Sequence, residues 1–475
     1  MTEETNMAFA LTIGGKAVPC ADSFAVIDPA TGAEFAQCPL ASVAQLDQAV
    51  AAARVAFPGW AATPIERRAE MIHAFADALA AEADDLGALL SREQGKPLAA
   101  AVGEIHGAIH WTRTTAGFRP AVERIEQADG GRVEIHRKPL GVVGSITPWN
   151  FPVMIAIWHV IPALVAGNTV VQKPSPNTPL ATLRMVEIAA RHLPAGVWNV
   201  VTGDIEIGSG IAKHPDIDKV VFTGSTPTGR AIMRDGAANL KRLTLELGGN
   251  DAAIVLPDAD VEAIAPQIFQ YAFGNSGQIC AAIKRVYVHD SLHDALAEKV
   301  AALAAAAKVG PGTDPATQYG PLQNRRQFDY VSTLAEDARA QGGRFLAGGE
   351  PLDGEGYFFP ISVVAAVPDG NRIVDEEQFG PVLPIIRYND VEDVLARANA
   401  SENGLGGSVW STDIGRAAEL AQRLECGTAW VNSHSRISPD VPFGGAKQSG
   451  IGVEFGLHGL DEYMQLQTVR LPAGA

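Results

Sequence analysis

The feature that most constrains the fold is an alternation of short β-branched runs with helical segments, which begins near residue 141. Strands that alternate with helices predict right-handed βαβ units around a parallel sheet. The runs are Val142–Ile146, Thr169–Val171, Trp198–Val201, Lys219–Thr223 and Ala252–Val255, and the helical segments between the first four are Val153–Ala166, Thr178–Arg191 and Ile205–Lys213. Ligands of such sheets bind beyond the carboxyl ends of the strands, and small, polar or basic residues follow these runs. A nucleotide site is therefore expected there.

A second alternating region lies between about residues 280 and 445, so the predicted fold class is α/β with two units. Its strand-like runs are Arg285–Val288, Val382–Ile386, Gly407–Trp410 and Gly427–Val431, and its helices lie near residues 292–307, 324–341 and 413–425. Two strand-like pieces fall outside both units, a hairpin at Arg132–Arg137 and the segment Tyr463–Leu471. Because unpaired strand edges tend to associate, these pieces predict a sheet between subunits and at least a dimer.

An amphipathic pattern precedes the first unit. From Pro64 to Glu93 the apolar residues share one helical stripe, and Thr63 with Glu66 three residues later predicts a capping box at its start. Helices of this kind are expected to pack against a core and to carry no chemistry.

Charge and cysteine usage exclude several classes of protein. The chain has 37 Lys and Arg against 54 Asp and Glu, a net charge of −17, which argues against nucleic acid or an anionic membrane as the main partner. No apolar stretch reaches the ~20 residues of a membrane span. The 4 cysteines have no spacing typical of a zinc site, so no metal is expected. Free thiols and an acidic N-terminus predict a cytoplasmic protein.

Four features have residue types that suit chemistry, and each has a plainer interpretation. The turn Gly224–Gly229 follows a strand and opens a helix, which suits a phosphate, although such turns are more often structural. Lys173 ends an apolar strand and either bonds a ligand or reaches solvent. Cys280 follows a polar glycine turn, although a lone cysteine is usually an inert core residue. Glu246 lies among leucines and is either a general base with a raised pKa or a paired carboxylate.

Seven motifs in order make the chain resemble the NAD(P)-dependent aldehyde dehydrogenase superfamily over essentially its whole length. They are Thr147-Pro-Trp-Asn-Phe-Pro152, Lys173-Pro-Ser, Phe222-Thr-Gly-Ser225, Glu246-Leu-Gly-Gly-Asn250, Gly277-Gln-Ile-Cys280, Glu376-Glu-Gln-Phe-Gly-Pro381 and Pro442-Phe-Gly-Gly445. The resemblance implies a Rossmann-type dinucleotide-binding domain (1–118 and 140–247), an α/β catalytic domain (248–447), and a β-hairpin oligomerisation arm with a tail (119–139 and 448–475). It also implies a homodimer or homotetramer.

The resemblance also implies roles for individual residues. Cys280 matches the nucleophile that attacks the aldehyde, Asn150 matches the oxyanion hole together with the Cys280 N–H, and Glu246 matches the base that hydrolyses the thioester. Glu377 and Phe379 match positions at the nicotinamide ribose. The cofactor is further expected to contact Ile146, Thr147, Pro148, Trp149, Lys173, Ser175, Pro176, Gly203, Phe222, Gly224, Ser225 and Leu247.

Two departures from the family pattern bear on specificity. Pro176 stands where many NAD-preferring relatives carry a glutamate, so NAD is expected with NADP tolerated. The substrate pocket is expected to be apolar and rather open, and Trp158, Ile279, Ala281 and Ile437 are its predicted walls. Arg436 beside Ile437 raises the alternative of a semialdehyde dehydrogenase that acts on a carboxylated aldehyde, although Arg436 pointing to solvent or pairing with Asp440 is the plainer reading.

Three other functions remain to be compared with aldehyde oxidation. A CoA-acylating enzyme would lack the hydrolytic base, which argues against it because Glu246 is present. A cysteine hydrolase would need a histidine near Cys280, and none stands in the motifs. A binding protein on a retired enzyme scaffold is expected to have lost Cys280, Glu246 or Asn150, and all three remain.

Overall fold

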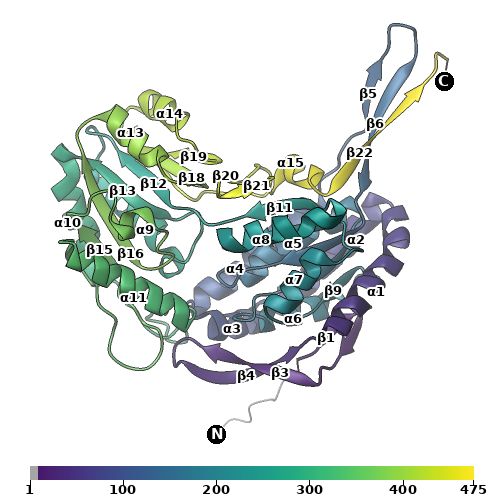
Figure 1. Ribbon diagram of the computed structural model, residues 1–475, viewed down its shortest axis with the longest axis horizontal. Coiled ribbons are helices and arrows are strands. Elements are labelled where there is room, and N and C mark those ends of the chain that lie inside the picture. Colours follow the sequence, from purple (N-terminus) through teal and green to yellow (C-terminus); the bar gives the residue numbers. More distant parts are fainter. Residues whose placement is uncertain (1–8, 475) are drawn as a thin grey trace.

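Two sheets form the body of the chain, and the computed structural model describes them within residues 9–474 (Figure 1). The first sheet has eight strands, and those from β9 to β11 are parallel. From edge to edge they are β2 (Lys16–Val18), β1 (Leu11–Ile13), β9 (Trp198–Val200), β8 (Thr169–Lys173), β7 (Val142–Ile146), β10 (Lys219–Thr223), β11 (Arg242–Glu246) and β21 (Gly450–Ile451). The predicted runs at β7 and β10 match residue for residue. Both strands are buried throughout, and each contains two consecutive valines, as is typical of a buried parallel strand.

The second sheet has seven strands, all parallel except for the pair β14–β15. In order they are β14 (Arg344–Ala347), β15 (Ser362–Ala365), β16 (Val382–Tyr388), β13 (Ile283–His289), β12 (Asp251–Val255), β18 (Gly406–Trp410) and β19 (Thr428–Val431). The predicted α/β fold class with parallel sheets is therefore confirmed. The predicted domain limits stay a prediction, although β21 pairs with β11 and so attaches part of the tail to the first sheet.

Helices cover both sheets, and the apolar residues between helices and sheets form the main cores. Around the first sheet lie α1 (Val43–Ala62), α2 (Ile65–Ala81), α3 (Ala83–Gln94), α4 (Leu98–Ala116), α5 (Pro152–Ala166), α6 (Leu180–Ala189), α7 (Ile205–Lys213) and α8 (Thr226–Gly236). Around the second lie α9 (Val261–Phe273), α10 (Asp290–Ala306), α11 (Arg325–Ala340), α13 (Val391–Asn399) and α14 (Ile414–Ala421). The smaller elements are β3 (Asp22–Asp28), β4 (Ala33–Leu40), β17 (Asn403–Gly404), β20 (Ala446–Lys447), α12 (Arg372–Asp375), α15 (Gly456–Asp461) and the 3-10 turns Ala237–Asn239 and Gly274–Gly277. No helix within residues 9–474 is long and apolar enough to span a membrane.

The helical stripe after residue 63 differs from the prediction in two ways. It forms two helices, α2 and α3, which separate at Glu82 where the backbone leaves helical geometry. The predicted capping box is wrong: Thr63 ends α1, its Oγ1 donates to the Gly59 carbonyl at 2.8 Å, and Pro64 begins α2 without a side-chain cap. The capping box of this region lies earlier, at Ser42 and Gln45 before α1.

The arm is a three-stranded antiparallel sheet that projects from the body (Figure 1). It consists of β5 (Glu123–Glu126), β6 (Arg132–Pro139) and β22 (Met464–Leu471), with β6 in the centre. The two pieces predicted as orphans thus pair with each other within one chain, from Met464 opposite Pro139 to Leu471 opposite Arg132. Only the outer edges of β5 and β22 are left without a partner strand in the described chain.

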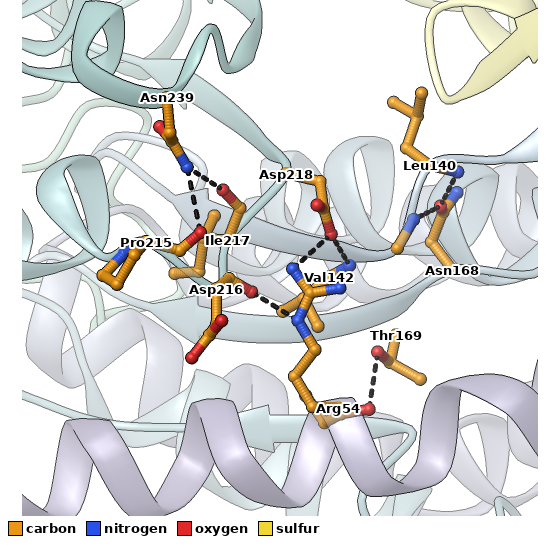
Figure 2. A network of polar contacts seen from close by, with 12 residues as sticks. Arg54, Leu140, Val142, Asn168, Thr169, Pro215, Asp216, Ile217, Asp218 and Asn239 are labelled. Carbon is orange, nitrogen blue, oxygen red and sulfur yellow. Dashed lines mark hydrogen bonds and ion pairs between the residues drawn. The ribbon is translucent and has the colours of Figure 1, made fainter.

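The amino ends of the first sheet's strands are fixed by a polar network (Figure 2). Asp218 accepts from the Val142 N–H at 2.7 Å and forms an ion pair with Arg54 of α1 at 2.7 Å. Asn168 accepts from the Leu140 N–H at 2.7 Å, and Thr169 Oγ1 donates to the Ala53 carbonyl at 3.0 Å. These bonds satisfy backbone groups that enter the sheet. This end of the sheet is therefore occupied by structural contacts, and the opposite end is left for ligands.

Candidate active site

The three predicted catalytic residues come from three elements and meet at the carboxyl edge of the first sheet. Glu246 is the last residue of β11, Asn150 lies in the turn between β7 and α5, and Cys280 lies just before β13. Asn150 Nδ2 donates to the backbone carbonyl of Gln278 at 3.0 Å, which joins the first sheet to the cysteine segment. The charge of Glu246 acts on the Cys280 thiol. One edge of the fold thus carries all three side chains.

The segment before Cys280 has an unusual backbone. Asn275, Ser276 and Gly277 are consecutive residues with positive φ, at 49°, 55° and 75°. Left-handed conformations of non-glycine residues cost free energy and persist only where surrounding contacts hold them. Ser276 Oγ donates to the Gly320 carbonyl at 2.8 Å, and a Cβ at Gly277 would collide with the Gly380 carbonyl. Contacts with Gly320 and Gly380 therefore hold this turn in its conformation, and the turn fixes the position of Cys280.

The thiol of Cys280 is half-buried and is neutral at rest. Burial raises its pKa to about 12, and the charges of Glu377, Glu246 and Asp251 act in the same direction. The sequence interpretation required an exposed, polar setting for a reactive thiolate, and the structure corrects it because carboxylates and apolar side chains surround the sulfur. The nucleophile must therefore lose its proton during the reaction.

Glu246 is 4% exposed, and neither of its carboxylate oxygens has a hydrogen-bond partner among residues 9–474. Burial raises its pKa well above the ordinary value, and the charge of Glu454 adds to this. A buried carboxylate without a partner is costly, and this arrangement is typical of a functional base. The structure excludes the paired carboxylate that the sequence left open.

Glu454 was missed by the sequence analysis. It is 3% exposed, and its Oε1 lies 3.3 Å from Nε2 of His159, a fully buried residue of α5. His159 also contacts Ser145 at 3.1 Å and Thr223 at 2.9 Å. The only local signal was a carboxylate between Val453 and Phe455, in a segment assigned to the tail.

Lys173 lies at the end of β8 and is 5% exposed. Burial lowers the pKa of its ammonium to about 8, although Asp204 opposes the shift. Nζ donates to the Pro174 carbonyl at 3.1 Å. An ammonium has three hydrogens, so Lys173 keeps donors for a ligand above the strand ends. The alternative of a lysine that reaches solvent is excluded by its burial.

Aromatic and acidic residues from the two sheets face each other above this edge. Trp149 and Phe379 make an edge-to-face contact with centroids 5.4 Å apart. Glu377 accepts from the Gly249 N–H at 3.2 Å; burial raises its pKa to about 8, and the ammonium of Lys284 opposes that shift. The remaining residues predicted to contact the cofactor end or follow strands of the same edge: Ile146, Thr147, Pro148, Ser175, Pro176, Gly203, Phe222, Gly224, Ser225 and Leu247.

An apolar cluster surrounds Cys280 on its other side. The predicted substrate residues Trp158, Ala281 and Ile437 belong to it, together with Cys280 itself. Ile279 is half-buried beside Gly274, where a Cβ would lie 3.2 Å from Ile279 Cδ1. The other members were not predicted as substrate residues, although Phe443 stands in the motif Pro442-Phe-Gly-Gly445; an apolar side chain by itself gives no local signal of function. They are Trp111, Leu405, Trp430, Phe443 and Phe455. Trp158 and Phe455 are in contact, with centroids 4.8 Å apart.

Arg436 is exposed at the edge of this cluster. Its Nε donates to the Tyr271 hydroxyl at 3.2 Å, and its backbone carbonyl accepts from Trp430 Nε1 at 3.0 Å. Its exposure agrees with one of the two plainer alternatives, a side chain that points to solvent. The other alternative, an ion pair with Asp440, is not formed among the described residues, where the guanidinium contacts Tyr271 instead.

Comparison with known proteins identifies the family. The family model described as "Aldehyde dehydrogenase family" matches residues 18–469. The chain belongs to the aldehyde dehydrogenase family. A probable aldehyde dehydrogenase from a Pseudomonas species is 41% identical and covers 97% of this chain and 94% of its own length. An aldehyde dehydrogenase from Bacillus cereus, solved with NAD⁺, is 36% identical with a TM-score of 0.96, and covers 98% of this chain and 97% of its own.

A further solved relative shows the range of cofactors among similar proteins. An NADP-dependent enzyme of Escherichia coli is 34% identical with a TM-score of 0.95, over 98% of both chains. The resemblance drawn from seven motifs is thus confirmed, and so is the prediction of an oxidoreductase that acts on aldehydes. The roles of the individual residues in this aldehyde dehydrogenase stay predictions.

Proposed function

We propose that this aldehyde dehydrogenase oxidises an aldehyde to the carboxylic acid through a thioester on Cys280, with NAD as the hydride acceptor and NADP tolerated. The observation that carries the proposal is the buried, unpartnered carboxylate of Glu246, which acts electrostatically on the Cys280 thiol. A hydrolytic base beside a nucleophile is what the second half of the reaction requires.

The residues present fit a dinucleotide. Ser225 precedes α8 without a side-chain cap, so the N–H groups of Thr226 and Thr228 are left for a pyrophosphate, whereas Pro227 between them has no N–H. Lys173 offers donors for the adenosine ribose, and Glu377 offers acceptors for the nicotinamide ribose. Bound NAD supplies the acceptor for the hydride that leaves the substrate carbon.

The chain's own groups perform the remaining steps. The Cys280 thiol releases its proton to solvent, and the thiolate sulfur bonds to the carbonyl carbon. The π electrons move to the oxygen, which accepts from Asn150 Nδ2 and the Cys280 N–H. Loss of hydride from that carbon leaves the thioester. Glu246 takes a proton from water as the water oxygen adds to the thioester carbon. The C–S bond then breaks, which releases the acid and restores the sulfur.

The direct test is the variant Cys280→Ala. It should bind NAD with unchanged affinity and lose dehydrogenation by several powers of ten, because the covalent partner is gone. NADH formation at 340 nm with a panel of aldehydes measures the activity, and quenching of protein fluorescence measures NAD binding. Turnover above about one percent of the unmodified protein would reject the assignment of the nucleophile.

Two alternative reactions are disfavoured by particular contacts. Transfer of the acyl group to coenzyme A needs no hydrolytic base, and the buried Glu246 with its raised pKa supports hydrolysis instead. A cysteine hydrolase needs a histidine free to take the thiol proton; His434, near the same cluster, has Nδ1 occupied by Ser408 at 2.9 Å and Nε2 by Asp251 at 3.3 Å.

The proposed substrate is an apolar aldehyde, supported by the aromatic cluster around Cys280. The alternative is a semialdehyde whose carboxylate pairs with Arg436, supported by the exposed guanidinium at the edge of that cluster. The variant Arg436→Ala distinguishes the two substrate classes. If Arg436 binds the substrate carboxylate, this variant should have a KM about ten- to a hundredfold higher for carboxylated aldehydes and an unchanged KM for neutral ones. Equal effects on benzaldehyde and succinate semialdehyde would reject the semialdehyde reading.

Assembly and location are also proposed. The unpaired outer edges of β5 and β22 support a homodimer or homotetramer built through the arm. Four free cysteines support a cytoplasmic location, where thiols stay reduced.

A further inference from the structure

A buried ion pair that the proposed reaction does not use lies directly behind Asn150. Lys96, between α3 and α4, is 3% exposed, and Glu104 of α4 is 4% exposed. Lys96 Nζ lies 2.5 Å from Glu104 Oε2. Burying both charges costs free energy, and an apolar pair of similar volume is often as stable. The pair therefore calls for an explanation other than stability.

Both partners bind the segment that carries Asn150. Lys96 Nζ donates to the Asn150 backbone carbonyl at 2.9 Å and lies 3.9 Å from the centre of the Phe151 ring. The second oxygen of Glu104, Oε1, accepts from the N–H groups of Val153 at 3.0 Å and Met154 at 3.1 Å, in the first turn of α5. The pair thus holds the segment at two points, on either side of Pro152.

The Asn150 side chain is held from the other direction. One hydrogen of Nδ2 is used by the Gln278 carbonyl at 3.0 Å, two residues before Cys280. The amide has a second hydrogen, and this one is left for an oxygen on the substrate carbon. Asn275 Nδ2 also donates to the Asn150 carbonyl at 3.2 Å. The direction of the free hydrogen is therefore set by the backbone position that Lys96 and Asn275 fix.

The loop that carries Lys96 is itself immobilised by the second unit. Gly95 has a φ of 94°, and a Cβ at Gly320 would collide with its carbonyl. The Leu98 N–H donates to the Gly312 carbonyl at 3.0 Å. The backbone of Lys96 is thus held by the contacts of its loop, and its side-chain ammonium is held by the ion pair with Glu104.

We propose that Lys96 and Glu104 are positioning residues that aim the Asn150 amide at the oxyanion of the tetrahedral adduct. This inference rests on the proposed oxyanion role of Asn150. Electrostatic stabilisation by a donor depends on its being aimed in advance, and a displacement of about 1 Å can cost a hundredfold in rate.

The test compares two reactions of Cys280 that differ in whether an oxyanion forms. Acylation by p-nitrophenyl acetate passes through a tetrahedral oxyanion, whereas alkylation by iodoacetamide is a displacement at carbon with no oxyanion. Lys96→Met should slow acylation about ten- to a hundredfold. Alkylation and NAD affinity should change less than about threefold, since neither depends on Asn150. Equal slowing of both reactions would mean a general disturbance of the site and would overturn the proposal.

A matched control is available in Lys219→Met. Lys219 is also fully buried; its ammonium donates to Thr244 Oγ1 at 2.6 Å and lies 4.9 Å from the Tyr463 ring centre, at the amino end of β10. The variant Lys219→Met should leave the ratio of the acylation rate to the alkylation rate unchanged, because Lys219 does not contact Asn150. If Lys96→Met does not fold, Glu104→Gln keeps the volume and one acceptor, and the same change in ratio is expected.

A double-mutant cycle distinguishes failure of this inference from failure of the proposed function. If Lys96 acts through Asn150, the double variant Lys96→Met/Asn150→Ala should acylate no more slowly than Asn150→Ala alone. If the double variant instead acylates more slowly than Asn150→Ala by the same factor that Lys96→Met causes alone, the two residues act independently and the inference is overturned. If Asn150→Ala itself acylates at the normal rate, the oxyanion role fails. If Asn150→Ala is slow and Lys96→Met is not, only the positioning role fails.

Discussion

At the scale of single residues, the active site combines a nucleophile and a base whose pKa values are both raised. Burial raises the pKa of the Cys280 thiol to about 12, and burial together with the charge of Glu454 raises the pKa of Glu246 above its ordinary value. Forming a thiolate here is costly because the thiol is buried and the charges of Glu377, Glu246 and Asp251 oppose its ionisation. The reaction therefore requires the Cys280 thiol to lose its proton before the sulfur attacks.

This electrostatic setting predicts an alkaline activity profile. Cys280 acts as the thiolate, and burial raises the pKa of its thiol to about 12, so the reactive fraction and with it kcat/KM should rise with pH between about 6 and 9. Initial rates of NADH formation at constant ionic strength measure the profile. A flat or falling profile across this range would contradict it.

The base gives a second prediction at the same scale. Glu246→Gln should allow acylation and slow hydrolysis of the thioester, because the amide cannot take a proton from water. Stopped-flow measurement at 340 nm should show a burst of NADH followed by a slow steady state. Equal loss of burst and steady state would indicate that Glu246 is needed earlier, for example to deprotonate Cys280.

At the scale of elements, helices α3 and α4 pack at unusually close range. At Gly87 of α3 a Cβ would lie 3.0 Å from the Val102 Cα and 3.1 Å from the Val102 backbone nitrogen. Backbone atoms on the facing helix cannot give way as a side chain can. The glycine is therefore required by the approach of the helices, and this pair carries the loop that holds Lys96.

A matched pair of substitutions tests that packing. Gly87→Ala should destabilise the protein by about 1–3 kcal/mol, the usual cost of overpacking. Gly103→Ala, on the exposed side of α4 with nothing within 4 Å of its Cβ, should stabilise it by up to about 1 kcal/mol through helix propensity. Thermal midpoints by circular dichroism compare the two. Similar midpoints for both variants would contradict the close approach.

How far the sequence predicts these elements depends on whether the signal is local. Strands β7 and β10 are short runs rich in β-branched residues and bounded by turns, so their limits could be read directly. The break at Glu82 could not, because α2 and α3 together present one regular stripe. The pairing of β6 with β22 joins residues that lie more than three hundred positions apart, from Pro139 with Met464 to Arg132 with Leu471, and no local pattern reports it.

The same distinction explains what was missed in the site. Cys280, Glu246 and Asn150 stand in motifs with turn residues around them. Lys96, Glu104 and Glu454 are charged residues in ordinary helical or loop sequence, and such residues usually face solvent. Their burial is a consequence of contacts between distant segments, and no local pattern in the sequence indicates it.

At the scale of the whole molecule, the arm projects from the body, and the outer edges of its strands β5 and β22 have no partner strand in the described chain. Leu466 on β22 is 58% exposed, whereas Val55 on α1 of the body is 84% exposed. An exposed apolar residue on a strand with an unpaired edge is typical of an interface. Leu466→Asp should therefore reduce the mass of the assembly measured by light scattering, and Val55→Asp should not. An unchanged mass for Leu466→Asp would place the interface elsewhere.

The loop between α3 and α4, residues 95–97, also bears on the thermal unfolding of the molecule. Backbone atoms of Gly95 and Leu98 lie against Gly320 and Gly312, so a segment of the first unit is interlocked with one of the second. Neither sheet can open without removing those contacts from the other. Heating should therefore produce one calorimetric peak for both sheets, and catalysis should be lost at the same temperature as the fold, with no partly melted enzyme that still works.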